Sequence, residues 1–159
     1  FTPVDQQDGQ DDRPNADWLG FGGQETLYSY GIAPMALLSA SRSALSDLVR
    51  SHVPEDHIRF LESLFLTVSV PGNLFVHAGI RPGTALDMQV EDDLLWIRDD
   101  FFNGPPDQNY RVIHGHTPGK EAVFAEGRIC IDTGAFATGI LTAIRVLPDG
   151  STFLLDTRK

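Results

Sequence analysis

Residues 65–80 read FLTVSVPGNLFVHAGI, two runs of β-branched and aromatic residues separated by Pro-Gly-Asn. Such runs favour strands and Pro-Gly-Asn is typical of a tight turn, so the segment predicts a β-hairpin. The second run ends at His77, and the small residues Ala78 and Gly79 follow it. A strand that ends in this way delivers a polar side chain to the edge of a sheet, where small residues let the backbone approach a ligand closely.

A similar arrangement recurs at residues 112–118, VIHGHTP, where His114 and His116 flank a glycine at the end of a predicted strand. Imidazoles held at the ends of rigid strands are typical of a metal centre. The alternative interpretation, that these are ordinary half-buried histidines, has about equal weight from the residues alone. The other two histidines, His52 and His57, lie beside charged residues on predicted helices, and we expect them to face solvent.

The N-terminal part of the chain predicts helices. Residues 1–17 contain five aspartates and almost no large apolar residue, which is typical of a disordered acidic lead-in. We expect a short helix after a Gly-Gly turn, stopped by Gly31, and a longer one after Ser41. Pro54 suits the first turn of a third helix. The expected buried stripe of that third helix is Ile58, Leu61 and Leu64.

The C-terminal part predicts strands, with one short helix around EDDLLWIRDDFF at residues 91–102. We expect strands at RVIHGH (111–116) and RICIDTG (128–134). ILTAIRVL (140–147) and STFLLDT (151–157) flank Pro-Asp-Gly, a strong hairpin signal. Helices come first and a largely antiparallel set of strands follows, so the fold class is α/β of the α+β kind.

Composition limits the function. Twelve Lys and Arg stand against 22 Asp and Glu in 159 residues, a formal charge of -10. This balance repels a phosphate backbone, so we expect no nucleic-acid partner, and an anionic substrate would need metal ions or a placed arginine. The single cysteine excludes an internal disulfide and a thiolate-rich metal site. No apolar run reaches the ~18 residues of a membrane helix, so we expect a soluble, cytoplasmic protein without a membrane partner.

Five segments carry a resemblance to a known family. They are WLGFGGQETLYSYGI (18–32), NLFVHAGIRPG (73–83), DDLLWIRDDF (92–101), VIHGHTP (112–118) and ICIDTGAFATGILTAI (129–144). In order and spacing they resemble the second half of bacterial phosphoprotein-phosphatase-type metallophosphoesterases, the calcineurin-like family. The resemblance covers the chain from Trp18 to about Val146. It implies a β-sandwich flanked by helices, with two metal ions at the carboxyl ends of strands.

The resemblance also assigns roles. His77 and His116 match two family ligands of the same metal ion. Arg98 matches an arginine suited to phosphate binding, because a guanidinium fork fits two phosphate oxygens. The alternative for Arg98 is a surface salt bridge to Asp99 or Asp100. Imidazole ligands suit Mn, Fe or Zn better than Ca or Mg, so we expect a pair of divalent transition-metal ions, with Mn the first choice.

Several neighbouring residues have weaker assignments. His114 could contact phosphate, although support of the site fits it better, and Asp132 could hold a histidine ring or a loop amide in place. We interpret Cys130 as a small structural residue of a strand and Trp96 as a core residue. Phe136 could line the substrate cleft, but packing is the simpler role.

The family's first-half motifs, G-D-x-H-G, G-D-x-x-D-R-G and G-N-H-E, do not occur here. We therefore interpret residues 18–159 as the C-terminal portion of a metallophosphoesterase domain. The intact parent is then expected to hydrolyse phosphate monoesters, as a serine/threonine protein phosphatase does, through a hydroxide bound by two metals. The 159-residue chain alone is expected to be inactive.

Two alternatives stay open. The first is a non-catalytic remnant or partner subunit that retains the scaffold without the chemistry. The second keeps the metal centre and replaces the phosphoprotein substrate with a dinucleoside polyphosphate, since substrate choice lies in loops that one sequence does not explain.

Overall fold

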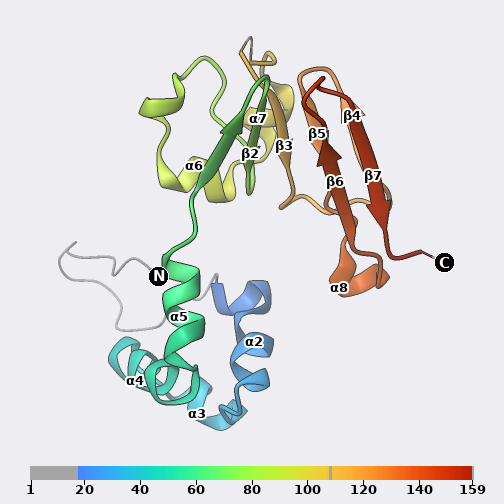
Figure 1. The fold of residues 1–159 in the computed structure, drawn as a ribbon. Helices are drawn as coiled ribbons and strands as arrows, with labels where there is room; N and C mark the ends of the chain where they lie inside the picture. The colour runs from blue at the N-terminus through green and yellow to red at the C-terminus, as the bar shows by residue number, and fades with distance from the viewer. Residues whose placement is uncertain (1–17, 108, 159) are drawn as a thin grey trace. The chain divides into compact units, whose positions relative to one another are not determined.

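The computed structural model describes residues 18–107 and 109–158, and Figure 1 shows its ribbon. The chain forms two compact units, one ending at Leu64 and the other beginning at Phe65. The acidic lead-in expected at residues 1–17 lies outside the described residues. No helix in the described part of the chain combines the length and apolar character needed to cross a membrane.

The first unit is helical. Its elements are η1 (Leu19–Gly23, a π-helical turn), α2 (Gln24–Ser29), α3 (Pro34–Leu38), α4 (Arg42–His52) and α5 (Glu55–Glu62). The predicted boundaries are confirmed: Ser41 caps α4 by accepting a hydrogen bond from the Ala44 amide, and Gly31 follows α2 with a φ of 87°. Glycine adopts that left-handed conformation at little cost, which is why it ends a helix well.

One expectation for this unit is wrong. The stripe Ile58, Leu61 and Leu64 was expected to be buried, but Leu61 is 45% exposed and Leu64 is 54% exposed, while Ile58 is half-buried. The core of the unit is built by residues 18–49, with Leu27, Ile32 and Leu37 at its centre. Amphipathic spacing shows which face of a helix is apolar, but it does not show whether another element covers that face.

The second unit contains the strands. They are β1 (Thr67–Val70), β2 (Asn73–Val76), β3 (Arg111–His114), β4 (Val123–Ala125), β5 (Arg128–Cys130), β6 (Thr142–Val146) and β7 (Thr152–Asp156). Five of them form a sheet in the order β1-β2-β3-β5-β4, and β6 pairs with β7 in a separate hairpin. The chain is thus of mixed α and β structure, as the sequence predicts.

The strands are largely antiparallel, as expected, but the sheet has a parallel centre that the sequence did not predict. The hairpins β1–β2 and β6–β7 are antiparallel as predicted, and β4 adds a third hairpin with β5. The centre of the sheet is different, because β2 pairs with β3 and β3 with β5 in parallel. Their carboxyl ends therefore meet at one edge of the sheet, and this edge positions the candidate site.

Short helices connect and flank these strands: η2 (Leu86–Met88), α6 (Glu91–Trp96), α7 (Asp99–Asn103) and α8 (Ala135–Thr138). The single helix expected around residues 91–102 is thus two helices with a break at Ile97 and Arg98. The core of the unit joins β2 and β3 to α6 and α7, with Leu74, Val112, Leu94 and Phe101 among its buried residues.

Candidate metal and phosphate site

The parallel centre of the sheet explains why residues far apart in sequence meet. His77 follows β2, His114 ends β3 and Asp132 lies two residues beyond β5. Backbone hydrogen bonds extend the pairing past the strands, since the Gly115 amide donates to the His77 carbonyl and the Ile131 amide donates to the His114 carbonyl, each at 2.9 Å. The ends of the three strands are therefore held in register where the polar side chains lie.

His77 and His116 converge, as predicted, although 39 positions separate them. The Nε2 atom of His77 lies 3.2 Å from the Nδ1 atom of His116, and the ring centroids are 5.0 Å apart. The two nitrogens share a hydrogen bond whose donor depends on the tautomers. Their separation also matches that of two nitrogens bound to one ion at ~2.1 Å, which lie about 3.0–3.4 Å apart at the angles of octahedral or tetrahedral coordination.

The backbone at His116 is unusual. His116 is the non-glycine residue with a positive φ, 64°, in the described chain, and the Thr117 amide donates to the Gly115 carbonyl at 2.7 Å. This is a tight three-residue turn centred on a histidine, a conformation that costs on the order of 1–3 kcal/mol outside glycine. The turn directs the His116 ring toward His77, so the strained backbone at His116 brings the two rings together.

The electrostatics of the pair favour neutral imidazoles. Burial is the main cause that lowers the pKa of His77, and the Asp132 carboxylate partly offsets it. Burial and the charge of Arg98 also lower the pKa of His116. A neutral imidazole has a lone pair to offer a metal ion, whereas a protonated one has none. Burial therefore favours the neutral form of both imidazoles, the form that a metal ligand requires.

The ligand set is incomplete. Among the residues that the structure describes, no group of three or more His, Cys, Asp or Glu side chains is arranged to hold a metal ion. Asp132 holds the loop beyond β5, because its Oδ1 atom accepts a hydrogen bond from the Gly134 amide at 2.9 Å. That contact is the loop-amide role predicted for Asp132. The described residues therefore provide two candidate ligands and a supported loop.

Arg98 lies against the same turn. Its Nη1 atom donates to the Thr117 hydroxyl at 3.0 Å and to the His116 carbonyl at 3.3 Å. This places the guanidinium beside the histidine pair, as predicted. The alternative, a salt bridge to Asp99 or Asp100, is not found among the ion pairs of the described residues, and the Asp100 carboxylate is bound by Arg81 at 2.9 Å.

His114 is deeply buried at 2% exposure, with its ring edge-on to Phe101 and tilted against Phe102. Its Nδ1 atom lies 3.1 Å from the Gly115 carbonyl, and burial lowers its pKa. A side chain packed in this way supports the turn below His116. Of the two roles considered for His114, the geometry favours support over phosphate contact.

Two expectations about aromatic residues are wrong. Trp96 was expected in the core but is 46% exposed, with its ring perpendicular to that of His116 at 5.7 Å. The buried residues of α6 are Asp93 and Leu94, so Trp96 lies on a different face of the helix. Phe136 was expected to pack, yet it is 88% exposed on the one-turn helix α8. Cys130 is buried in β5, as the structural role requires.

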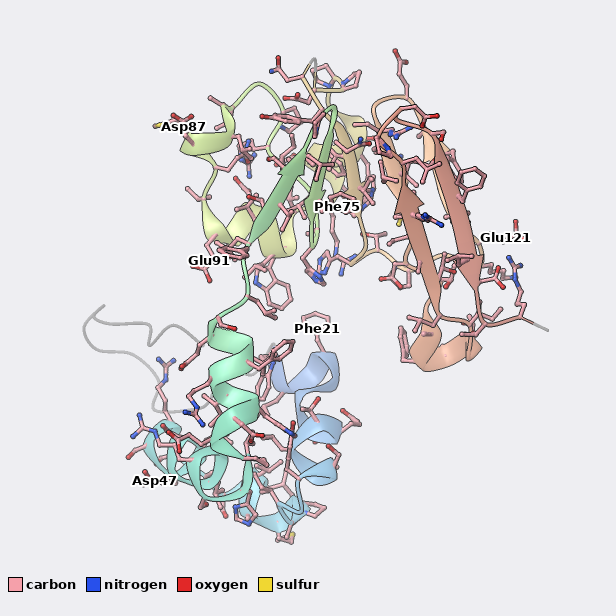
Figure 2. The ribbon with its side chains drawn as sticks, in the orientation of Figure 1. Phe21, Asp47, Phe75, Asp87, Glu91 and Glu121 are labelled. Atoms are coloured by element: carbon pink, nitrogen blue, oxygen red, sulfur yellow. The ribbon has the colours of Figure 1, made fainter. Side chains whose placement is uncertain are left out.

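Sequence reasoning missed Arg81, which follows the V-H-A-G segment. Its guanidinium holds Asp93 with two hydrogen bonds and Asp100 with a third. The signal in the sequence was an arginine two residues beyond Gly79, followed by an acidic stretch at residues 91–100. In Figure 2, Phe75 on β2 and Glu91 at the start of α6 mark the two elements that this part of the chain connects.

No protein-family model matches the chain, and no curated protein matches it.

Proposed function

We propose that the chain carries the C-terminal half of the active site of a two-metal phosphoesterase of the calcineurin-like type, which hydrolyses phosphate monoesters. One observation carries the proposal: His77 and His116 face each other at 3.2 Å, and the Arg98 guanidinium lies against the turn that holds His116. Two adjacent imidazoles and an arginine fork combine a cation site with a phosphate site.

The charge of the protein supports this combination. With a formal charge of -10, the chain repels anions at long range, so a phosphate ester needs strong local positive charge. Two bound divalent ions, with Mn the first choice and Fe or Zn the alternatives, would supply that charge and a metal-bound hydroxide. Arg98 would add a guanidinium that orients the phosphoryl oxygens.

Five residues of the chain have a defined task in this proposal. His77 and His116 present neutral imidazoles to one ion, and Arg98 binds the phosphate. Asp132 and His114 hold the loop and the turn on which these side chains lie. The remaining ligands and the acid that protonates the leaving group belong to motifs that this sequence does not contain, so we assign them to a preceding part of an intact parent.

The test is hydrolysis of p-nitrophenyl phosphate, with Mn, by the natural polypeptide that carries these residues. We expect turnover that falls by at least about 10²-fold in both His116→Ala and Arg98→Ala. The first variant removes a ligand of the metal ion, and the second removes the cation that orients the phosphoryl group. Full activity in both variants would contradict the proposal.

A second candidate function is a non-catalytic scaffold or partner subunit. It is favoured by the lack of a group of three metal-ligating side chains among the described residues. The two candidates differ in metal binding, because a scaffold that catalyses no reaction does not need His77 and His116 to bind an ion. An intact polypeptide that binds no metal ion measurably would favour the scaffold.

A further inference from the structure

A cluster of ion pairs lies next to Arg98. The Nε atom of Arg81 donates to Asp93 Oδ2 at 2.7 Å, and its Nη2 atom donates to Asp93 Oδ1 at 2.5 Å. Its Nη1 atom reaches Asp100 Oδ2 at 2.9 Å. One guanidinium therefore holds two carboxylates at once, a geometry that only the planar fork of arginine provides.

The two carboxylates belong to different helices. Asp93 lies in α6 and Asp100 in the first turn of α7, while Arg98 lies in the break between the two helices. The backbone of Arg98 has φ -132° and ψ -95°, and its carbonyl accepts hydrogen bonds from the Phe101 and Phe102 amides. The direction of the Arg98 side chain therefore depends on how α6 and α7 are joined, and Arg81 bridges that junction.

Arg81 is itself fixed at its backbone. The Arg81 amide donates to the Gln89 side-chain oxygen at 2.8 Å, and the Gln89 side-chain amide donates to the Arg81 and Thr84 carbonyls at 3.0 and 2.9 Å. These bonds fix the backbone from which the guanidinium reaches α6 and α7. Arg81 thus links both helices to this loop through its bonds to Asp93 and Asp100.

Asp100 is the residue that could otherwise disturb the site. It lies two positions after Arg98, and its side chain is 67% exposed. A carboxylate so close to Arg98 would compete with a phosphate group for the same guanidinium. In the structure the Asp100 carboxylate accepts a hydrogen bond from Arg81. Arg98 donates instead to the Thr117 hydroxyl and to the His116 carbonyl. Both arginines line one cavity, of about 280 Å³, together with Trp96 and Asp99.

We propose that Arg81 is a positioning residue for Arg98: it joins α6 to α7 across the break and holds Asp100 away, so that the Arg98 guanidinium stays at the His116 turn and is available to phosphate. The part of this statement that concerns phosphate rests on the proposed function. The part that concerns the place of Arg98 is a property of this chain without any ligand.

The test uses the 159-residue chain and the Arg81→Lys variant. Lysine keeps a cation beside Asp93, so we expect the fold to be maintained, but an ammonium group lacks the planar fork that binds both Asp93 oxygens and reaches Asp100 from a third nitrogen. Nuclear Overhauser contacts between the Arg98 side chain and the Thr117 methyl group report the position of Arg98 without ligand. We expect these contacts in the native chain and their loss in Arg81→Lys.

A rescue variant separates positioning from a general structural effect. Asp100→Asn removes the competing carboxylate, so we expect the Arg98–Thr117 contacts to return in the double variant Arg81→Lys, Asp100→Asn. The matched control is Arg158→Lys, which alters an arginine that pairs with Asp156 and Glu121. The control should leave the contacts unchanged. Contacts that persist in Arg81→Lys, or that fail to return in the double variant, would overturn the proposal.

A second readout concerns ligand. Inorganic phosphate is titrated into the chain in the presence of Zn²⁺, an ion that imidazoles bind well and that does not broaden the signals, while the Arg98 Nε–H resonance is followed. We expect Arg81→Lys to weaken the response about tenfold, as loss of a contact to a charged group does, and the double variant to recover it. If the native chain shows no response at Arg98 while the contacts behave as expected, the phosphate role in the proposed function fails and the positioning role of Arg81 stands.

Discussion

The Nε2 atom of His77 and the Nδ1 atom of His116 face each other at 3.2 Å across the carboxyl edge of a parallel strand pair. The pairing of β2 with β3 brings the two strand ends together, and the tight turn at His116 rotates its ring toward His77. The relationship therefore depends on backbone register as much as on the two side chains. Substitutions that disturb either strand end should act on the site through this geometry.

Gly79 shows how tightly the end of β2 is packed. A Cβ atom at this position would lie 2.6 Å from the Phe101 ring and 3.0 Å from Ile97. We expect Gly79→Ala to lower the free energy of unfolding by about 1–3 kcal/mol, because overpacking forces a buried ring to move. Urea unfolding followed by circular dichroism measures the change.

The control for this prediction is Gly115→Ala, on the neighbouring strand end. There the added Cβ atom would meet Asp132 at 3.6 Å, an ordinary van der Waals contact. We expect a change of no more than about 0.5 kcal/mol, as for a substitution that neither clashes nor opens a cavity. Equal losses in the two variants would show that close packing at Gly79 is not the cause.

The Arg81–Asp93 pair predicts a dependence of stability on pH. Hydrogen bonds from Arg81 hold the pKa of Asp93 below its usual 3.8. Between the folded pKa and 3.8 the unfolded chain binds more protons than the folded chain, so stability is lost as the pH falls through the folded pKa. Urea unfolding of the native chain should therefore show a drop in the free energy of unfolding between about pH 5 and pH 2.

The variant Asp93→Asn removes the titrating group from this pair. We expect its free energy of unfolding to be lower than that of the native chain at pH 6, and to fall less on acidification. Identical pH profiles for the two chains would mean that Arg81 contributes nothing to the ionisation of Asp93.

Much of the local structure was predictable because it depends on neighbouring residues. Ser41 as a helix cap and the Pro-Gly and Pro-Asp-Gly hairpins are signals contained in a few positions. The meeting of His77 with His116 was predicted from the family resemblance and from two similar strand ends. Its mechanism, the parallel pairing of β2 with β3, was not predicted, because pairing between distant strands leaves no local signal.

Other features were missed for the same physical reason. Tertiary packing decides three of them: the exposure of the apolar stripe of α5, the exposure of Trp96, and the hydrogen bonds from Arg81 to both Asp93 and Asp100. Periodicity gives the apolar face of a helix, and charge runs indicate a polar surface. Neither shows which arginine will bind which carboxylate.

The chain by itself should be a poor catalyst. Two histidines can hold one ion, but the described residues provide no bridging carboxylate for a second ion. A positioned proton donor, which typically contributes on the order of 10²–10⁴-fold, is also missing from the motifs present. Purified 1–159 with Mn should therefore hydrolyse p-nitrophenyl phosphate at or near the rate of the buffer. Robust turnover that disappears in His116→Ala would show that fewer ligands suffice than this account requires.

The most direct test of the central claim is binding of Mn²⁺ to the 159-residue chain, measured by isothermal titration calorimetry at pH 7.5 and at pH 5. We expect weak binding of one ion at the higher pH, weaker binding at the lower pH as the imidazoles protonate, and loss of binding in His77→Gln and in His116→Gln. His57→Gln is the matched control, since His57 is exposed in the helical unit and contacts Tyr30. Retention of full affinity in either site variant, or loss of it in the control, would contradict the claim that His77 and His116 form half of a metal site.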